Sequence, residues 1–277
     1  MKTVQCLYWL MLIHMLGGCG NTSEKKHRLS EAYPILRSGP GDMEFAFIPN
    51  GLFRMGEVDS HSAGWDDEEV HWVRITKSYW MQTTEVTFGQ WRDLMGSYPD
   101  TKGCYGKNTL TVSDSFPVVC VSWEDVQVFI DKLNKQSSDH YTYRLPTESE
   151  WENASRAFHE SDYSLDDSYD TFIWSEENSK GRSHSVGQLK ANLFGLYDTF
   201  GNVNEWTSDW YANYPIANSS LNPIEDPIGP NKGFLKVIRG GSYLNVRMNC
   251  IPHRRYRGFP NHKGSDTGFR LVRVERI

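Results

Sequence analysis

Two stretches of the sequence decide the fold: YRLPTESEWE at residues 143–152 and GNVNEW at residues 201–206. In the first, Thr147 and Glu150 form a capping-box pattern, in which each side chain bonds the backbone N–H of the other residue. Apolar residues follow at helical spacing, so a short helix is predicted to begin directly after Thr147. The second lies in a region rich in Gly, Asn and aromatic residues, where we expect aromatics such as Trp206 to hold the loops in place.

Outward from these stretches, short elements alternate with a long irregular segment. Strands are predicted where Phe, Val, Ile and Trp alternate, at residues 43–55, 70–86 and 269–274. Thr87 and Ser122 precede two further segments with helical spacing. From 161 to 264, Gly, Asn, Pro and Ser dominate and no helical period lasts for more than two turns. Few helices, short strands and an irregular half predict a loop-rich α+β domain.

Further motifs occur in a fixed order along the chain. They are FRMG at 53–56, EE at 68–69 with His71, EVT at 85–87, PVVCVSW at 117–123, FGLYD at 194–198, RGGS at 239–242 and GFR at 268–270. With the two stretches above, this series resembles the formylglycine-generating-enzyme-like (sulfatase-modifying factor) domain family, from about residue 42 to 274. The resemblance implies a C-type-lectin-like fold of the formylglycine-generating-enzyme type, which is α+β with little regular secondary structure.

The first residues are predicted to be an export signal. Lys2 precedes an apolar run that is shorter than the ~20 residues needed to span a bilayer. The run ends in LGGC at 16–19, which resembles the bacterial lipobox, in which the cysteine is lipidated and becomes the mature N-terminus. The alternative is an ordinary signal peptide in which Cys19 is incidental.

The lipoprotein interpretation divides the chain into three parts. A signal peptide occupies 1–18, a flexible polar tether 19–41, and the domain 42–277. Gly20, rather than Asp, follows the cysteine, which is similar to lipoproteins passed on to the outer membrane. We therefore expect a protein of the bacterial cell envelope that is held on the membrane by a lipid at Cys19.

The charge balance limits the kinds of partner. The 277 residues carry a net charge of −6. This argues against nucleic acid, because phosphate binding needs Lys and Arg concentrated on one face. The partner that we expect is a protein or a small-molecule ligand.

Three cysteines lie beyond the export signal: Cys104, Cys120 and Cys250. An odd number outside the cytosol implies either one disulfide with one remaining thiol, or three thiols. Cys104 and Cys120 flank a loop, and they are the pair that we expect to be joined.

The resemblance also implies a calcium site, with calcium as a structural ion. Family members bind the ion through a loop that matches residues 198–205. By position, the ligands are the side chains of Asp198 and Glu205 and the carbonyl groups of Gly201 and Val203. Calcium accepts such mixed oxygen donors, and glycine lets the backbone turn its carbonyls inward. The alternative is a structural turn with two solvated carboxylates.

The resemblance places a catalytic centre after the Gly-Gly-Ser motif. In formylglycine-generating enzymes two cysteines there hold copper(I), which activates oxygen to convert a substrate cysteine into an aldehyde. The matching residues here are Asn245 and Cys250, and Ser242 matches a serine near the active site. Copper(I) prefers two thiolates to a hard amide oxygen, so Asn245 counts against copper binding and oxidation. The alternative for Cys250 is a small buried side chain.

Residues 243–256 mix aromatic, Asn, His and Arg side chains, which is typical of adaptable binding loops. Two functions therefore stay open. The first is a formylglycine-generating oxidase in which Cys250 and Ser242 carry the chemistry. The second is a non-catalytic C-type-lectin-like surface module that binds a ligand or a partner, because a fold alone does not fix a function.

Overall fold

The structure, a computed structural model, describes residues 35–38, 42–57, 67–106, 110–158, 169–215 and 219–276. The predicted signal peptide and the lipidation site Cys19 lie outside the described residues. Within the segment predicted to be a tether, β1 (Ile35–Ser38) pairs with β2 (Met43–Ile48). None of the helices in the described ranges is long and apolar enough to cross a membrane.

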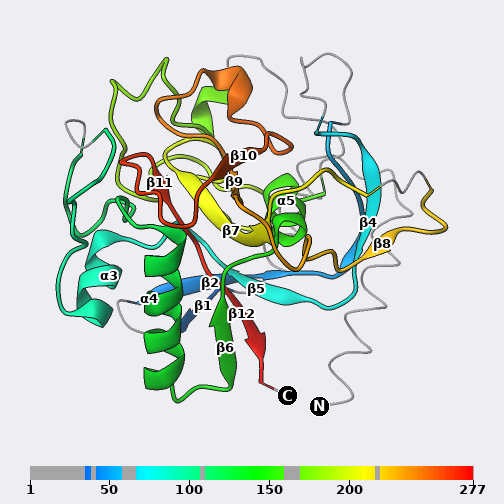
Figure 1. Ribbon diagram of the computed structural model, residues 1–277, viewed down its shortest axis with the longest axis horizontal. Helices are drawn as coiled ribbons and strands as arrows, with labels where there is room; N and C mark the ends of the chain where they lie inside the picture. The colour runs from blue at the N-terminus through cyan, green and yellow to red at the C-terminus, as the bar shows by residue number, and fades with distance from the viewer. Residues whose placement is uncertain are drawn as a thin grey trace. The chain divides into compact units, whose positions relative to one another are not determined.

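A five-stranded antiparallel sheet joins both ends of the described chain (Figure 1). Its order is β1–β2–β5–β12–β6. Its other strands are β5 (Tyr79–Gln82), β12 (Val272–Glu275) and β6 (Tyr141–Arg144). The predicted closing strand is confirmed, and it lies inside this sheet rather than at its edge.

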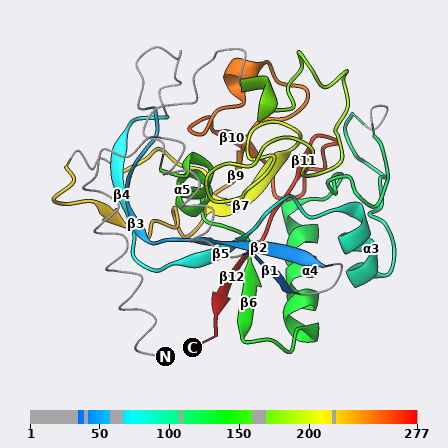
Figure 2. The same ribbon diagram turned by 180° about the vertical axis from the view of Figure 1, so that it is seen from behind.

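Two smaller sheets hold the motifs of the irregular half. One has the order β10–β9–β7–β11 and the other the order β3–β4–β8. The first consists of β10 (Tyr256–Gly258), β9 (Lys236–Arg239), β7 (Asn204–Trp210) and β11 (Thr267–Gly268). The second consists of β3 (Gly51–Met55), β4 (His71–Ile75) and β8 (Ile224–Glu225). Figure 2 shows both sheets from behind, on either side of helix α5 (Glu148–Arg156).

Three helices begin at the predicted capping residues. They are α3 (Phe88–Met95) after Thr87, α4 (Trp123–Gln136) after Ser122, and α5 after Thr147. In each helix both bonds of the capping box are present, so the backbone N–H groups of the capping residue and of the third helical residue are satisfied locally. Two 3₁₀ turns, η2 (Tyr169–Thr171) and η3 (Arg247–Asn249), interrupt the loops.

The core lies between α3, α4 and the sheets. The Trp91 and Phe129 rings stack at 5.2 Å, and Phe269 meets both edge-on. Cys104 and Cys120 form a disulfide, which confirms the expected pair.

Buried ion pairs hold the loops where regular structure is scarce. Arg239 on β9 bonds both Glu148 and Glu152 on α5, and Glu152 also pairs with Arg156. Arg255, which lies in the loop before β10, forms an ion pair with Glu148. All five side chains are buried. Such a network is costly to break, because removing one member leaves an uncompensated buried charge.

Candidate functional site

The turn after β9 carries the serine of the Gly-Gly-Ser motif. Gly240 and Gly241 both have positive φ, and a Cβ on Gly241 would lie 2.7 Å from Cys250 Sγ. Ser242 is buried, and Asn245 Oδ1 accepts hydrogen bonds from its backbone N–H and its hydroxyl group, each at 2.9 Å. Asn245 therefore closes this turn with its amide oxygen.

Cys250 lies against this turn as a buried thiol. Its Sγ donates to the carbonyl oxygens of Ser242 and Asn245, at 3.6 Å and 3.8 Å. Burial, and secondly the carboxylate of Glu177, raise the pKa of the thiol to about 12. The thiolate is the form that attacks substrates and binds metals, so burial and the raised pKa disfavour the reactive form of Cys250 in the absence of a metal.

These residues do not fit the copper site of the family. Copper(I) prefers two thiolates. Here one donor is a thiol with a raised pKa, and the other position holds an amide whose oxygen is engaged by Ser242. The mismatch lies in the donor atoms themselves.

A polar cluster lies beside the turn, and it adds Asp266, which the sequence interpretation missed, to the predicted site residue Ser242. Asn204 Nδ2 donates to Asp266 Oδ2 at 3.1 Å, and the Ser242 hydroxyl lies 3.4 Å from the same oxygen. Asn204 Oδ1 is buried and accepts no hydrogen bond from the described residues. An unsatisfied buried acceptor is costly, so this position favours a donor from a ligand or from water. The one signal for Asp266 in the sequence is its place just before the GFR motif.

The predicted calcium loop is buried and lies beside an arginine. Arg270 donates to both oxygens of Glu205, each at 2.7 Å, and Trp151 Nε1 donates to one of them at 2.8 Å. Asp198 has a positive φ, and its Oδ2 accepts from the Gly187 N–H at 2.6 Å. Two solvated carboxylates are therefore not what the structure shows.

Two buried carboxylate oxygens accept no hydrogen bond from the described residues: Asp198 Oδ1 in this loop, and Oε2 of Glu85, whose other oxygen accepts from Asn202 of the loop. Burial raises the pKa of Asp198 to about 6. Burial, followed by the charge of Asp198, raises the pKa of Glu85 well above its usual value. In the described part, no cluster of three or more His, Cys, Asp or Glu side chains could hold a metal. A calcium site in this loop would need backbone carbonyls, such as those of Gly201 and Val203, in addition to carboxylate oxygens.

The predicted recognition segment at 243–256 divides into two halves. Leu244, Val246 and Met248 are exposed, with 54% of Met248 accessible, and we call these three side chains the recognition face. The second half is buried, because Arg254 bonds Glu68 and Arg255 bonds Glu148. Only the first half can meet a partner.

A neighbouring loop adds an exposed aromatic pair. Tyr105, of which 71% is exposed, stacks on His262 with 5.2 Å between ring centroids. The Tyr105 carbonyl accepts from the Ser265 N–H, next to Asp266 and its contact with Ser242. The pair is therefore linked to the turn by a short chain of contacts.

This fold and site define an α+β domain in which a Gly-Gly-Ser turn packs on a cysteine. The family model described as the sulfatase-modifying factor enzyme 1-like domain (FGE-sulfatase) matches residues 40–275. The chain belongs to this family, as the order of its motifs predicted.

Curated relatives carry two kinds of name. A protein named serine/threonine-protein kinase pkn1 of Chlamydia pneumoniae is 28% identical over 257 residues, which cover 83% of this chain but 38% of the relative. The formylglycine-generating enzyme of Streptomyces coelicolor is 32% identical over 184 residues, which cover 60% of this chain and 55% of the relative. Because the chain spans only about half or less of these relatives, their activities are not transferred here as findings.

Solved structures confirm the fold. Treponema denticola variable protein 1 aligns with a TM-score of 0.71 and 25% identity, over 86% of this chain and 98% of its own. PvdO from Pseudomonas aeruginosa aligns with a TM-score of 0.73 and 24% identity, over 88% and 98%. The C-type-lectin-like α+β fold is thus shown for the described domain.

Proposed function

We propose that this domain is a non-catalytic binding module of the sulfatase-modifying-factor family, and that it holds a ligand or a partner protein at the recognition face. The observation that carries the proposal is the role of Asn245. It stands where the family has a copper-binding cysteine, and its Oδ1 accepts two hydrogen bonds from Ser242, which leaves Cys250 as the one thiol beside the turn. The side chains that carry oxidation in the family are absent or engaged elsewhere.

The recognition face supplies what binding requires. Leu244, Val246 and Met248 are exposed next to a turn fixed by Asn245 and packed on Cys250. Exposed apolar side chains on a rigid support are features of protein-binding surfaces, because little conformational freedom is lost on association.

We further propose that calcium is a structural ion at Asp198, Gly201, Val203 and Glu205, with Glu85 as an additional oxygen donor. The two open carboxylate oxygens support this assignment. We also propose that the chain is held in the bacterial cell envelope, at the outer membrane, by a lipid at Cys19. The LGGC sequence supports that location, and the mass of the mature N-terminal peptide tests it.

The catalytic half of the proposal is tested with the purified chain, copper(I), oxygen, a reductant and a sulfatase-type cysteine peptide. Mass spectrometry should find no peptide aldehyde. Aldehyde that forms with the unchanged chain and is lost in Cys250→Ala would overturn the proposal. Product that appears only with Asn245→Cys would show a scaffold that lacks the second thiol and nothing else.

The binding half is tested with a photoreactive residue at Met248. Irradiation in cells should give a discrete adduct. The matched control is the same residue at Val128, an exposed apolar position on α4 that should give none. Equal adducts at both positions, or none at Met248, would count against a partner at the recognition face.

A further inference from the structure

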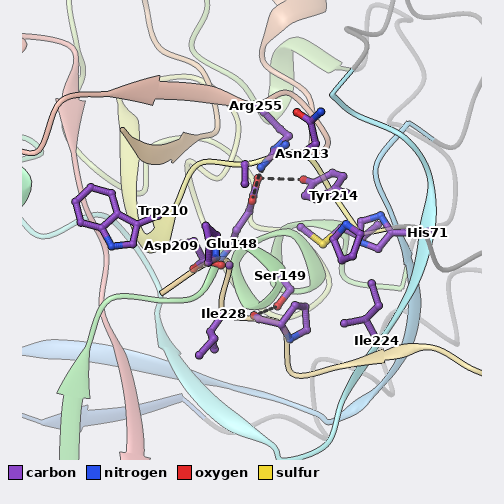
Figure 3. Close-up of a pocket in the computed structure, with 16 residues that line it drawn as sticks. His71, Glu148, Ser149, Asp209, Trp210, Asn213, Tyr214, Ile224, Ile228 and Arg255 are labelled. Atoms are coloured by element: carbon purple, nitrogen blue, oxygen red, sulfur yellow. Dashed lines mark hydrogen bonds and ion pairs between the residues drawn. The ribbon is translucent and has the colours of Figure 1, made fainter. Parts of the chain in front are cut away.

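A cavity of about 370 Å³ lies away from the Gly-Gly-Ser turn, between the start of α5, the end of β7 and the loop after β8 (Figure 3). Most of its lining is apolar: Met55, Trp210, Ile224, Pro227, Ile228 and Pro230. Neither Ser242 nor Cys250 lines it. The cavity has the size and the character of a small-ligand site.

On one wall of this cavity, the carboxylate of Glu148 is already paired with arginine side chains of the protein. Glu148 Oε1 accepts from Arg239 at 2.8 Å, from Arg255 at 2.7 Å and from the Tyr214 hydroxyl at 3.0 Å. Figure 3 shows Glu148, Arg255 and Tyr214 joined in this way. These groups have little bonding capacity left for a ligand.

Asp209 is different. Only 4% of it is exposed, and its Oδ2 accepts from the Glu148 N–H and from the Ser208 hydroxyl, both at 2.9 Å. The hydrogen bonds that the described residues donate to Asp209 both go to Oδ2, and Asp209 is among the residues that line the cavity. A Cβ on Gly229 would lie 3.4 Å from the other oxygen, Oδ1, so glycine keeps the approach to it open.

The ammonium group of Lys236 on β9 interacts electrostatically with Asp209, but its direct contacts are with other groups. Lys236 Nζ donates to the Ser208 carbonyl at 2.8 Å and lies 4.0 Å and 3.8 Å from the ring centroids of Trp123 and Trp210. Asp209 forms no ion pair with a cation of the described residues. Asp209 is thus a buried carboxylate that lines a largely apolar cavity and interacts with Lys236 through space, with no direct ion pair to a cation of the described residues.

We propose that this cavity binds a primary ammonium group on an apolar stem. Asp209 Oδ1 accepts hydrogen bonds from the ammonium, while Trp210, Pro227 and Ile228 pack around the stem. Burial and the charge of Glu148 raise the pKa of Asp209 to about 7, and a bound cation offsets this by favouring the ionised carboxylate. A free alkylamine and the lysine side chain of a protein both supply this chemistry.

The test is calorimetric titration of the full chain at about pH 8, where an alkylammonium is still protonated. The probes are n-pentylammonium, Nα-acetyl-lysine methylamide and their neutral counterparts, n-pentanol and Nα-acetyl-norleucine methylamide. We expect at least one of the two cations to bind saturably, about tenfold or more tightly than its neutral counterpart. Binding of the amine alone identifies a free amine as the ligand, and binding of the lysine derivative identifies a protein side chain.

Asp209→Asn should remove this preference, whereas Asp131→Asn, at an exposed carboxylate on α4, should keep it. Because 64% of Ile228 is exposed, Ile228→Lys should fold, and its own ammonium should compete with the ligand. Ile228→Gln is the matched control for the lost apolar contact. Equal affinity for cation and neutral probe, an undiminished preference in Asp209→Asn, or no saturable binding of either cation would overturn the proposal.

Discussion

At the residue scale, Asn245 stands where the family has a copper ligand and serves as a turn cap. Its Oδ1 accepts two hydrogen bonds from Ser242. Asn245→Ala should therefore lower the free energy of unfolding by about 1 kcal/mol. Asn249→Ala, in the same segment, removes no hydrogen bond made by its side chain and is the control. Urea denaturation measures both, and equal losses would mean that the cap contributes nothing.

Asp209 gives a second prediction at this scale, on pH. Its pKa is raised in the folded protein to about 7, so the folded state holds the proton more tightly than the unfolded state. The resulting stabilisation is present below about pH 4 and is lost as the pH rises to about 7. Asp209→Asn cannot ionise and should thus be a few kcal/mol more stable than the natural chain above about pH 7, and similar to it near pH 4. Thermal melts across this range measure the difference, and a constant difference would contradict the assignment.

The sequence predicted individual site residues to the extent that short motifs carry them. Ser242 and Cys250 could be assigned to one candidate site because the resemblance matches both of them to the family's segment at and after the Gly-Gly-Ser motif. Glu85 and Asp209 could not be recognised, because their chemistry comes from burial and from partners far along the chain. The Glu148 N–H that bonds Asp209, for example, is 61 residues away.

At the scale of elements, the Cys104–Cys120 disulfide closes a loop with a sequence separation of 16 residues. Loop-closure entropy predicts that it contributes about 3 kcal/mol, by restricting the unfolded chain. Reductant should lower the urea midpoint of the natural chain accordingly. It should leave the midpoint of a Cys104→Ser, Cys120→Ser variant unchanged. An effect of equal size in that variant would assign the loss to another cause.

The loop at residues 198–205, which leads into β7, gives a prediction about the effect of calcium on stability. An ion that binds only the folded state stabilises it by about 3 kcal/mol when present at roughly a hundredfold excess over its Kd. Calcium should therefore raise the melting temperature, and a chelator should reverse this. Asp198→Asn and Glu85→Gln should abolish the calcium effect, and Asp131→Asn should not. A melting temperature that calcium leaves unchanged would contradict the proposed site.

Helices were easier to predict than loops, for a physical reason. The capping boxes at Thr87, Ser122 and Thr147 are satisfied within three residues, so the sequence shows them directly. The irregular half is held by contacts between distant residues. Arg255 and Glu148, for instance, are 107 positions apart, and no local pattern indicates such a pair.

At the scale of the whole molecule, the chain keeps the scaffold of the family but has Asn245 in place of one of the two copper-binding cysteines. The sheets, the capped helices and the buried network around Arg239 all support the turn at Ser242. The donor atoms beneath that turn differ from those that copper(I) requires. Under the proposed function, this scaffold presents a binding surface instead of a reactive copper ion.

The measurement that tests this claim most directly is competition for copper(I) between the chain, with its Cys104–Cys120 disulfide intact, and a chromophoric chelator, with Asn245→Cys measured alongside. We expect copper(I) to stay with the chelator in the presence of the natural chain. Asn245→Cys should take more copper(I) from the chelator than the natural chain does, because it supplies a second thiol. If the natural chain instead took one equivalent of copper(I) from the chelator, and Cys250→Ala did not, the proposed loss of copper binding would be wrong. The oxidase function would then be favoured.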